Sequence, residues 1–209
     1  MNSSIEKIYV KDVYNKIAKP FDKTRAVLWN HITDFIKNMP DNSLVADVGC
    51  GNGKNMMLNT KCQFIGIDFT ESFTTICSNK NLEVFLADTL KIPYRNNVFD
   101  YVISIAVIHH LSTPEKRLES ILELIRIANI GGLIYILVWS FEQREDAKRK
   151  FEKQDELIPW KMKDITYYRY YHLFVKDELF ELCNGIKNVI IKQVFYECGN
   201  SGIILEKII

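Results

Sequence analysis

The sequence has no long apolar run. Its longest one, Leu133–Trp139, falls far short of the ~20 residues that a membrane-spanning helix needs. The amino-terminal stretch Met1–Asp12 mixes charged residues with its apolar ones, so no signal peptide is expected. These absences predict a soluble protein with no membrane partner, located in the cytoplasm, with the nucleus as a second compartment.

Excess charge is also missing, because the formal net charge is only +1. This balance argues against a surface coated with nucleic acid. Positive charge gathers in the amino-terminal arm and in a segment after residue 140, where it can contact a phosphate backbone or form solvated helix faces. The five cysteines are odd in number and lack the paired spacing of metal sites, which suits a reducing compartment and predicts no bound metal.

Glycine is scarce as well, with nine residues in 209, so a cluster of three stands out. Gly49, Gly51 and Gly53 follow the apolar run Leu44–Val48, which suits a buried strand of a parallel sheet. Glycines let the chain turn sharply and bring backbone amides close to a ligand. The pattern predicts a nucleotide-type site between a strand and a helix, although a purely structural tight turn has the same residues.

Three aspartates are placed to bind a ligand at this turn. Asp68 ends a predicted strand over residues 63–67 and can accept both hydroxyls of a ribose. Asp88 ends the next predicted strand, over residues 82–88, where it can accept from an adenine amino group. Asp47 precedes the glycines and favours a cationic amine over a pyrophosphate.

S-adenosylmethionine has an amine, a ribose and an adenine, and this pattern resembles the Rossmann-like S-adenosylmethionine-dependent methyltransferases. A nicotinamide-linked oxidoreductase is the more distant alternative. The predicted cofactor contacts are Asp47, Gly49, Gly51, Gly53, Asp68, Asp88, Thr89, Leu90 and Ile105.

Two amphipathic helices are predicted ahead of the first strand. The first covers residues 5–17 and is interrupted by Pro20, and a loop follows over residues 21–25. The second helix runs from residue 28 to residue 36. Residues 1–40 can therefore fold over the cofactor as a helical lid, which would bring Tyr14 and Arg25 to the site.

The second half of the chain continues the alternation of strands and helices. A fourth strand over residues 99–105 leads to His109 and His110, which places both histidines at the ligand-binding end of the sheet. The next helix begins near Pro114 and is predicted to end at Gly131 and Gly132, before a strand over residues 133–139. Adjacent histidines point in different directions, so a metal reading is weak.

The carboxyl-terminal part completes the predicted fold. A helix over residues 176–184 precedes a hairpin of strands 189–196 and 203–208. We expect an α/β fold with one domain over residues 1–209, in which a mostly parallel seven-stranded sheet ends in an antiparallel hairpin and carries helices on both faces. Residues 140–176 interrupt the alternation as an insertion facing the substrate. Its aromatic and basic residues suit stacking on bases, or equally packing on the sheet.

The motifs together resemble the eukaryotic tRNA methyltransferases that methylate the carboxyl of 5-carboxymethyluridine at the wobble position. The likeness runs nearly end to end, and its outer motifs are more specific than the glycines. The residues that carry it are Val13–Ala18, Phe21, Thr24, Arg25, Asp47–Lys54, Ser104–His110, Trp139, Glu142, Gln143, Pro159, Trp160 and Tyr168–Leu173.

The resemblance implies roles for individual residues and for partners. It implies a tRNA anticodon loop as substrate and a small zinc-binding activator subunit, for which the edge strand 82–86 is the hypothesised interface. It implies Arg25, His110 and Arg169 as catalytic residues, with one arginine on the carboxylate and the other on phosphate or base. The implied substrate contacts are Tyr14, His109, Trp139, Tyr170 and His172.

This chain departs from the family pattern at three places. Leu111 stands where members commonly show tryptophan, Ser201-Gly202 replaces a bulky aromatic pair, and a low-complexity insertion before Tyr167 is absent. The sequence is also compatible with two other functions. One is methylation of a small molecule, and the other is a catalytically silent, methyltransferase-like RNA-binding scaffold.

Overall fold

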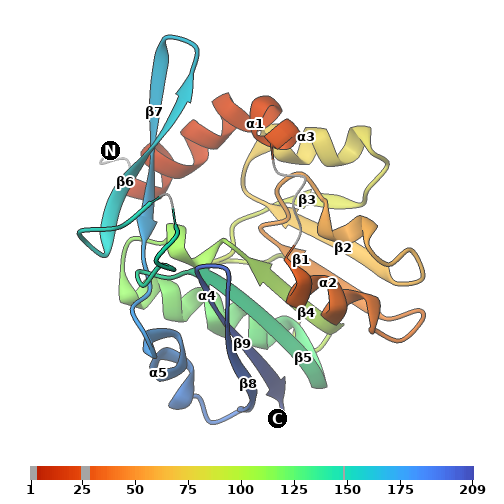
Figure 1. Ribbon diagram of the computed structural model, residues 1–209. Coiled ribbons are helices and arrows are strands. Elements are labelled where there is room, and N and C mark those ends of the chain that lie inside the picture. The colour runs from red at the N-terminus through yellow and green to blue at the C-terminus, as the bar shows by residue number, and fades with distance from the viewer. Residues whose placement is uncertain (1–3, 25–28, 148) are drawn as a thin grey trace.

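The computed structural model describes residues 4–24, 29–147 and 149–209. A seven-stranded sheet in the order β3-β2-β1-β4-β5-β9-β8 forms its centre (Figure 1). The five strands from β3 to β5 are parallel, while β9 and β8 are antiparallel. The predicted fold class is thus confirmed, as is the edge position of β3. The strands are β1 Leu44–Val48, β2 Gln63–Asp68, β3 Val84–Leu86, β4 Phe99–Ile105, β5 Ala128–Trp139, β8 Val189–Glu197 and β9 Asn200–Lys207.

Helices cover both faces of the sheet and bury it on each side. On one face Leu124 packs in the same apolar cluster as Val102, while on the other Ile36 packs in a second cluster with Ile103. Neighbouring residues of β4 therefore face different cores, which explains why the strand is apolar along its length. The helices are α1 Asp12–Thr24, α2 Asn30–Lys37, α3 Glu71–Asn79, α4 Pro114–Ile127 and α5 Glu178–Asn184. No helix in the described ranges is long and apolar enough to cross a bilayer.

The prediction that Pro20 interrupts the first helix is wrong. A π-helical turn over Lys7–Lys11 leads into α1, which continues through Pro20 to Thr24. A proline inside a helix costs about 3 kcal/mol, but packing on both sides of it holds the helix. Tyr14 lies 5.9 Å from the ring of Phe73 in α3, and Phe21 lies 5.6 Å from the same ring.

Gly131 and Gly132 do not end the helix before them. The helix α4 ends at Ile127, and β5 begins at once with Ala128. The pairing of β5 with β4 contains a register shift, and the glycines accommodate it: Gly131 has φ +79°, and a Cβ on Gly132 would lie 3.0 Å from the Asp100 carbonyl oxygen. Both residues thus belong to a β-bulge, which helix-end patterns do not distinguish from a cap.

Two further local elements differ from the sequence expectation. The glycine turn leads only into a short 3₁₀ turn, Asn55–Met57, rather than an α-helix. The insertion contains an antiparallel hairpin of β6, Asp155–Met162, and β7, Ile165–His172, which is a separate two-stranded sheet beside α1 (Figure 1). No strand was predicted there, although Trp160 lies opposite Tyr167 in its register.

Candidate active site

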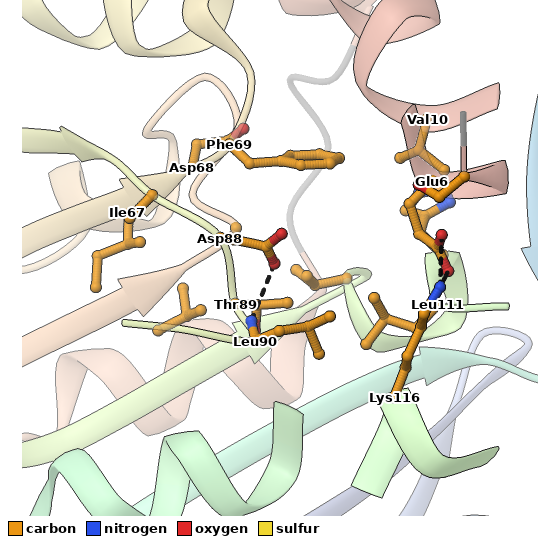
Figure 2. A pocket seen from close by; sticks show the side chains of 16 residues that line it. Glu6, Val10, Ile67, Asp68, Phe69, Asp88, Thr89, Leu90, Leu111 and Lys116 are labelled. Carbon is orange, nitrogen blue, oxygen red and sulfur yellow. Dashed lines mark hydrogen bonds and ion pairs between the residues drawn. The ribbon is translucent and has the colours of Figure 1, made fainter. Parts of the chain in front are cut away.

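Two adjoining cavities lie at the carboxyl ends of the parallel strands. The small cavity has a volume of about 330 Å³ and the large cavity about 480 Å³. Figure 2 shows the small cavity, with Asp88, Thr89 and Leu90 on one side and Glu6 and Leu111 on the other. The two cavities form one continuous site because they share six lining residues: Val10, Gly49, Asp68, Phe69, Val107 and His110.

The glycine turn forms one wall of this site. The Gly49 amide donates to the Ile67 carbonyl at 2.6 Å, and a Cβ at Gly49 would lie 2.2 Å from Val107. Gly51 has φ +54° and lines the large cavity, and no residue that the structure describes lies within 4 Å of where a Cβ would be. Gly53 lines neither cavity, and a Cβ there would meet Leu82 at 2.3 Å. Gly49 and Gly51 are therefore placed for a ligand, whereas Gly53 serves close packing.

Asp68 stands where the two cavities meet. One carboxylate oxygen accepts from the Gly51 amide at 2.9 Å, and the other accepts from the Thr70 amide at 2.8 Å. Burial raises the pKa of this carboxyl, while the backbone bonds oppose that rise. Each oxygen keeps lone pairs for further donors. This position between the cavities fits the hydroxyls of a ribose whose base enters the small cavity toward Asp88.

Asp47 is buried behind the glycine turn, at 1% exposure, and does not line either cavity. Its carboxylate oxygens have no hydrogen-bond partner in the described part of the chain. Burial, with a contribution from Asp68, raises its pKa to about 7. The Asn55 side chain and the charge of Lys54 oppose this rise. Asp68 and Asp88 thus line cavities that fit a ribose and an adenine, whereas the contact of Asp47 with the amine of S-adenosylmethionine stays a prediction.

A directed chain of hydrogen bonds forms the back of the large cavity. Arg169 Nη1 donates to the Tyr171 hydroxyl at 2.9 Å, which lies 3.1 Å from the Tyr14 hydroxyl. The Tyr14 hydroxyl lies 3.1 Å from His110 Nε2, and His110 Nδ1 lies 2.7 Å from the Tyr170 carbonyl. Because a carbonyl only accepts, Nδ1 donates and the neutral ring accepts at Nε2. Burial lowers the His110 pKa to about 3, which keeps the ring neutral.

The neighbouring histidine also belongs to this wall. His109 Nδ1 accepts from the backbone amide of Trp139 at 2.9 Å. Burial and the proximity of His110 hold the pKa of His109 well below its ordinary value. Both His109 and Trp139 line the large cavity, as does Ile105 at the end of β4. In the described part of the chain, no group of histidine, cysteine and acidic residues could hold a metal ion.

Arg169 is an unusual buried cation. It is 4% exposed, and its guanidinium lies 5.2 Å from the Trp160 ring and 5.3 Å from the Tyr171 ring. No carboxylate in the described ranges pairs with it, and its Nε has no hydrogen-bond partner. Arg169 does not line either cavity, so its charge lies one hydrogen bond behind the wall that Tyr171 forms.

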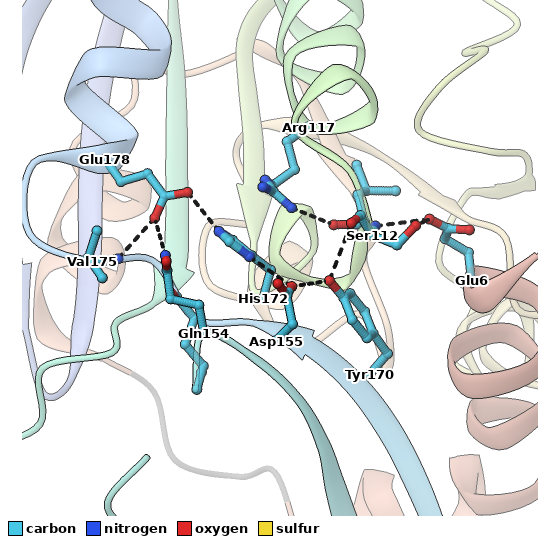
Figure 3. A network of polar contacts seen from close by, with 11 residues as sticks. Glu6, Ser112, Arg117, Gln154, Asp155, Tyr170, His172, Val175 and Glu178 are labelled. Carbon is cyan, nitrogen blue, oxygen red and sulfur yellow. Dashed lines mark hydrogen bonds and ion pairs between the residues drawn. The ribbon is translucent and has the colours of Figure 1, made fainter. Parts of the chain in front are cut away.

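Two residues expected at the substrate lie elsewhere. Tyr170 and His172 line neither cavity and belong to the polar network that Figure 3 shows. The Tyr170 hydroxyl donates to Asp155, and the His172 ring lies between Asp155 at 3.0 Å and Glu178 at 2.6 Å. These side chains anchor the β6–β7 hairpin to α5, while the Tyr170 carbonyl still orients His110. Arg25, the third expected catalytic residue, lies outside the described residues.

Tyr171 is a site residue that the sequence reasoning missed. It lines the large cavity and contacts the rings of His109, His110 and Trp139. The signal was present, because alternate residues of a strand share one face, so Arg169 and Tyr171 belong together once the segment is treated as a strand. Leu111, a departure from the family pattern, is buried and lines the small cavity.

The fold and the two-cavity site define a Rossmann-like methyltransferase of the S-adenosylmethionine-dependent class. The model of the family described as a methyltransferase domain matches residues 46–136. Among solved structures, an S-adenosylmethionine-dependent methyltransferase from Methanosarcina mazei superposes with a TM-score of 0.70 at 17% identity, covering 87% of this chain and 99% of that one. A chain in a Haloferax volcanii complex between the Trm112 methyltransferase activator and a putative methyltransferase gives 0.71 at 13%, with 96% and 98% covered.

Curated relatives define the family more narrowly. The tRNA (carboxymethyluridine(34)-5-O)-methyltransferase of Schizosaccharomyces pombe is 36% identical over 230 residues, which cover 99% of this chain and 100% of that protein. The chain belongs to the tRNA (carboxymethyluridine(34)-5-O)-methyltransferase family. The Xenopus tropicalis relative is 35% identical over 99% of this chain and 42% of its own length, and the Arabidopsis thaliana relative is 45% identical over 68% and 35%. The chain thus spans less than half the length of these two relatives.

Proposed function

We propose that this protein transfers the methyl group of S-adenosylmethionine to the carboxylate of 5-carboxymethyluridine at the wobble position of tRNA. The observation that carries the proposal is the buried Arg169 cation, which lacks a carboxylate partner in the described ranges and lies behind the large cavity. An isolated buried cation is costly, and an anionic acceptor offsets that cost when it enters. The names of the relatives described above support the same acceptor.

In this reaction the side chains need mainly to position the methyl donor and the carboxylate. When bound, S-adenosylmethionine supplies an electrophilic methyl group. A carboxylate with a pKa near ~4 is ionised at neutral pH, so no side chain has to remove a proton. His110 is neutral and already bonded at both nitrogens, which suits an orienting role. Holding the reactants in line can lower the barrier by ~7–11 kcal/mol.

The surface around the large cavity supports an RNA substrate. Tyr14 on the inner side of α1 lines the cavity, while the outer side of the helix carries exposed lysines. Tyr168 on β7 is 48% exposed, and its ring is available for base stacking. Trp160 and Tyr171 instead pack against the protein. The exposed lysines of α1 and the hairpin are Lys16, Lys19, Lys23, Lys161 and Lys163.

The exposed edge of the main sheet supports a protein partner. Strand β3 pairs only with β2 in the described part of the chain, and it presents Phe85 at 42% and Leu86 at 51% exposure. An unpaired apolar edge is a place where another chain adds a strand. The Haloferax volcanii neighbour was solved with a methyltransferase activator. A small zinc-binding activator added to β3 therefore fits, and a Phe85→Lys/Leu86→Glu variant that still binds it would refute this interface.

The function is tested by methyl transfer to an anticodon stem-loop that contains 5-carboxymethyluridine, with a zinc-binding activator present. We expect labelled methyl on this RNA and none on the same stem-loop with uridine at that position. Transfer to the free nucleoside at the same rate would indicate a small-molecule methyltransferase. Cofactor binding without transfer to any of these acceptors would indicate a silent RNA-binding scaffold.

A further inference from the structure

Among Arg169, Tyr171, Tyr14 and His110, which form one chain of hydrogen bonds, only the Tyr171 hydroxyl can donate its hydrogen to a different acceptor. Arg169 can only donate, so Tyr171 accepts from it. His110 donates through Nδ1 and accepts at Nε2, so Tyr14 donates to His110. The hydrogen between the two tyrosines therefore belongs to Tyr171 and points to Tyr14. In each of these three hydrogen bonds, the donor is therefore the group nearer Arg169 and the acceptor is the group nearer His110.

A carboxylate in the large cavity can accept a hydrogen bond from one of these two tyrosines without leaving a buried polar group unpaired. If Tyr14 turned away, His110 Nε2 would be left buried without a donor. If Tyr171 turns away, Tyr14 loses only a donor to its oxygen and keeps its own bond to His110. Burial and the neighbouring Tyr171 hold the Tyr14 pKa well above its ordinary value, so Tyr14 stays a neutral donor. Tyr171 is the group whose hydrogen is free to move.

The position of Arg169 makes the Tyr171 hydroxyl a strong donor. The guanidinium carbon lies 5.3 Å from the Tyr171 ring, and Tyr171 lines the cavity whereas Arg169 does not, so a substrate in the cavity meets the tyrosine rather than the guanidinium. Its bond to the Tyr171 oxygen instead polarises the hydroxyl toward a negative group on the cavity side. The positive charge thus acts on the carboxylate through one intervening hydroxyl. A single hydrogen bond from this hydroxyl lowers the nucleophilicity of the carboxylate less than a direct ion pair with arginine would.

We propose that Tyr171 is the carboxylate-binding residue of the acceptor site, with Arg169 as the positioning residue behind it. The inference rests on the proposed function, because it takes a carboxylate as the acceptor. It assigns the selectivity for a carboxylate over an uncharged isostere to the hydroxyl of Tyr171. In this assignment Tyr14 and His110 do not bind the substrate, and they set which groups donate in the chain of hydrogen bonds.

The test compares two anticodon stem-loops that differ only in the acceptor group, carboxymethyluridine or its neutral amide. Binding is measured by fluorescence anisotropy on the protein with its activator, and cofactor binding by calorimetry. We expect the wild type to prefer the carboxylate about tenfold or more, and Tyr171→Phe to reduce this preference to about twofold or less. The KM for the carboxylate RNA should rise in this variant, with cofactor affinity unchanged. The matched control is Tyr101→Phe, at the opposite end of β4 from the cavity, which should keep the preference.

A second variant keeps the test decisive if Tyr171→Phe folds poorly. Arg169→Gln keeps a donor near Tyr171 but removes the charge, so it should lose most of the preference too. If Tyr171→Phe folds and keeps the full preference, or if Tyr14→Phe alone abolishes it, the inference is wrong. If the wild type transfers no methyl to the carboxylate RNA, the proposed function fails instead. Transfer by the wild type with no carboxylate preference would leave the function standing and overturn the role of Tyr171.

Discussion

The glycine turn and the β6–β7 hairpin contribute to the same site in different ways. The turn places backbone amides and Asp68 at the cavities within one strand–turn–strand unit, residues 44–68. The hairpin places Tyr171 and Arg169 by packing against α1, whose Tyr14 is 157 positions away from Tyr171. The glycine-turn wall of the site is thus built from one local stretch, although Glu6 and Leu111 complete the small cavity from distant segments, and the wall that contains Tyr171 is assembled from distant segments throughout. This division suits an enzyme class that keeps one cofactor and changes acceptors.

The largest effect is expected on the cofactor side. Asp68→Ala removes a carboxylate that holds the glycine turn through Gly51 and Thr70 and that is placed for a ribose. Charge-assisted hydrogen bonds contribute about 1.5–3 kcal/mol each, so cofactor affinity should fall about 100-fold or more. Calorimetric titration with S-adenosylmethionine measures this. An affinity within threefold of wild type would refute the assignment of the ribose to Asp68.

On the acceptor side, His172→Ala should loosen the hairpin but spare the cofactor. The ring connects Asp155 of β6 to Glu178 of α5, and its loss should lower the free energy of unfolding by about 2 kcal/mol. Denaturant titration measures the stability, and calorimetry measures cofactor binding, which should stay within twofold. Lys163→Ala at the exposed hairpin tip is the matched control. A variant that loses cofactor affinity as strongly as Asp68→Ala would break the distinction between the two sides.

The contacts of Glu6, near the amino terminus, can be tested through the pH dependence of stability. Burial alone would raise the pKa of Glu6, but the bonds from Lys116 and Ser112 outweigh burial and lower it to about 2. A carboxyl whose pKa is lowered on folding stabilises the protein above its unfolded value and loses this contribution as pH falls toward 2. Glu6→Gln should therefore flatten the acid limb of stability between pH 4.5 and 2. An unchanged limb would contradict this anchoring of the helix to α4.

The smallest effect concerns the bulge that sequence patterns misread as a helix end. Gly131→Ala places a Cβ at φ +79°, which should cost about 1 kcal/mol although no described residue lies within 4 Å of that Cβ. Gly185→Ala is the control, because Gly185 follows α5 at φ −88° with open space around it. Equal melting temperatures for the two variants would mean that Gly131 is not required by its backbone conformation.

Sequence patterns predicted the parts of this molecule that depend on neighbouring residues. The strand before Gly49 and the aspartate after the second strand occupy the expected places, because a buried parallel strand and a glycine turn are both local features. The roles of Tyr170 and His172 could not be placed the same way. Their side chains are committed to Asp155 and Glu178, contacts that depend on how the hairpin packs. The continuity of α1 through Pro20 could not be predicted either, because it depends on the packing of Phe21 against Phe73 of α3.

The proposed acceptor of the methyl group is a carboxylate oxygen of a tRNA wobble nucleoside. The most direct measurement treats the labelled RNA product of the transfer reaction with mild alkali and asks whether the label is released. A methyl ester hydrolyses under these conditions, so we expect the label to be released. Label that stays on the RNA would mean methylation of a nitrogen, a carbon or a ribose oxygen, and it would contradict both the carboxylate acceptor and the role assigned to Arg169.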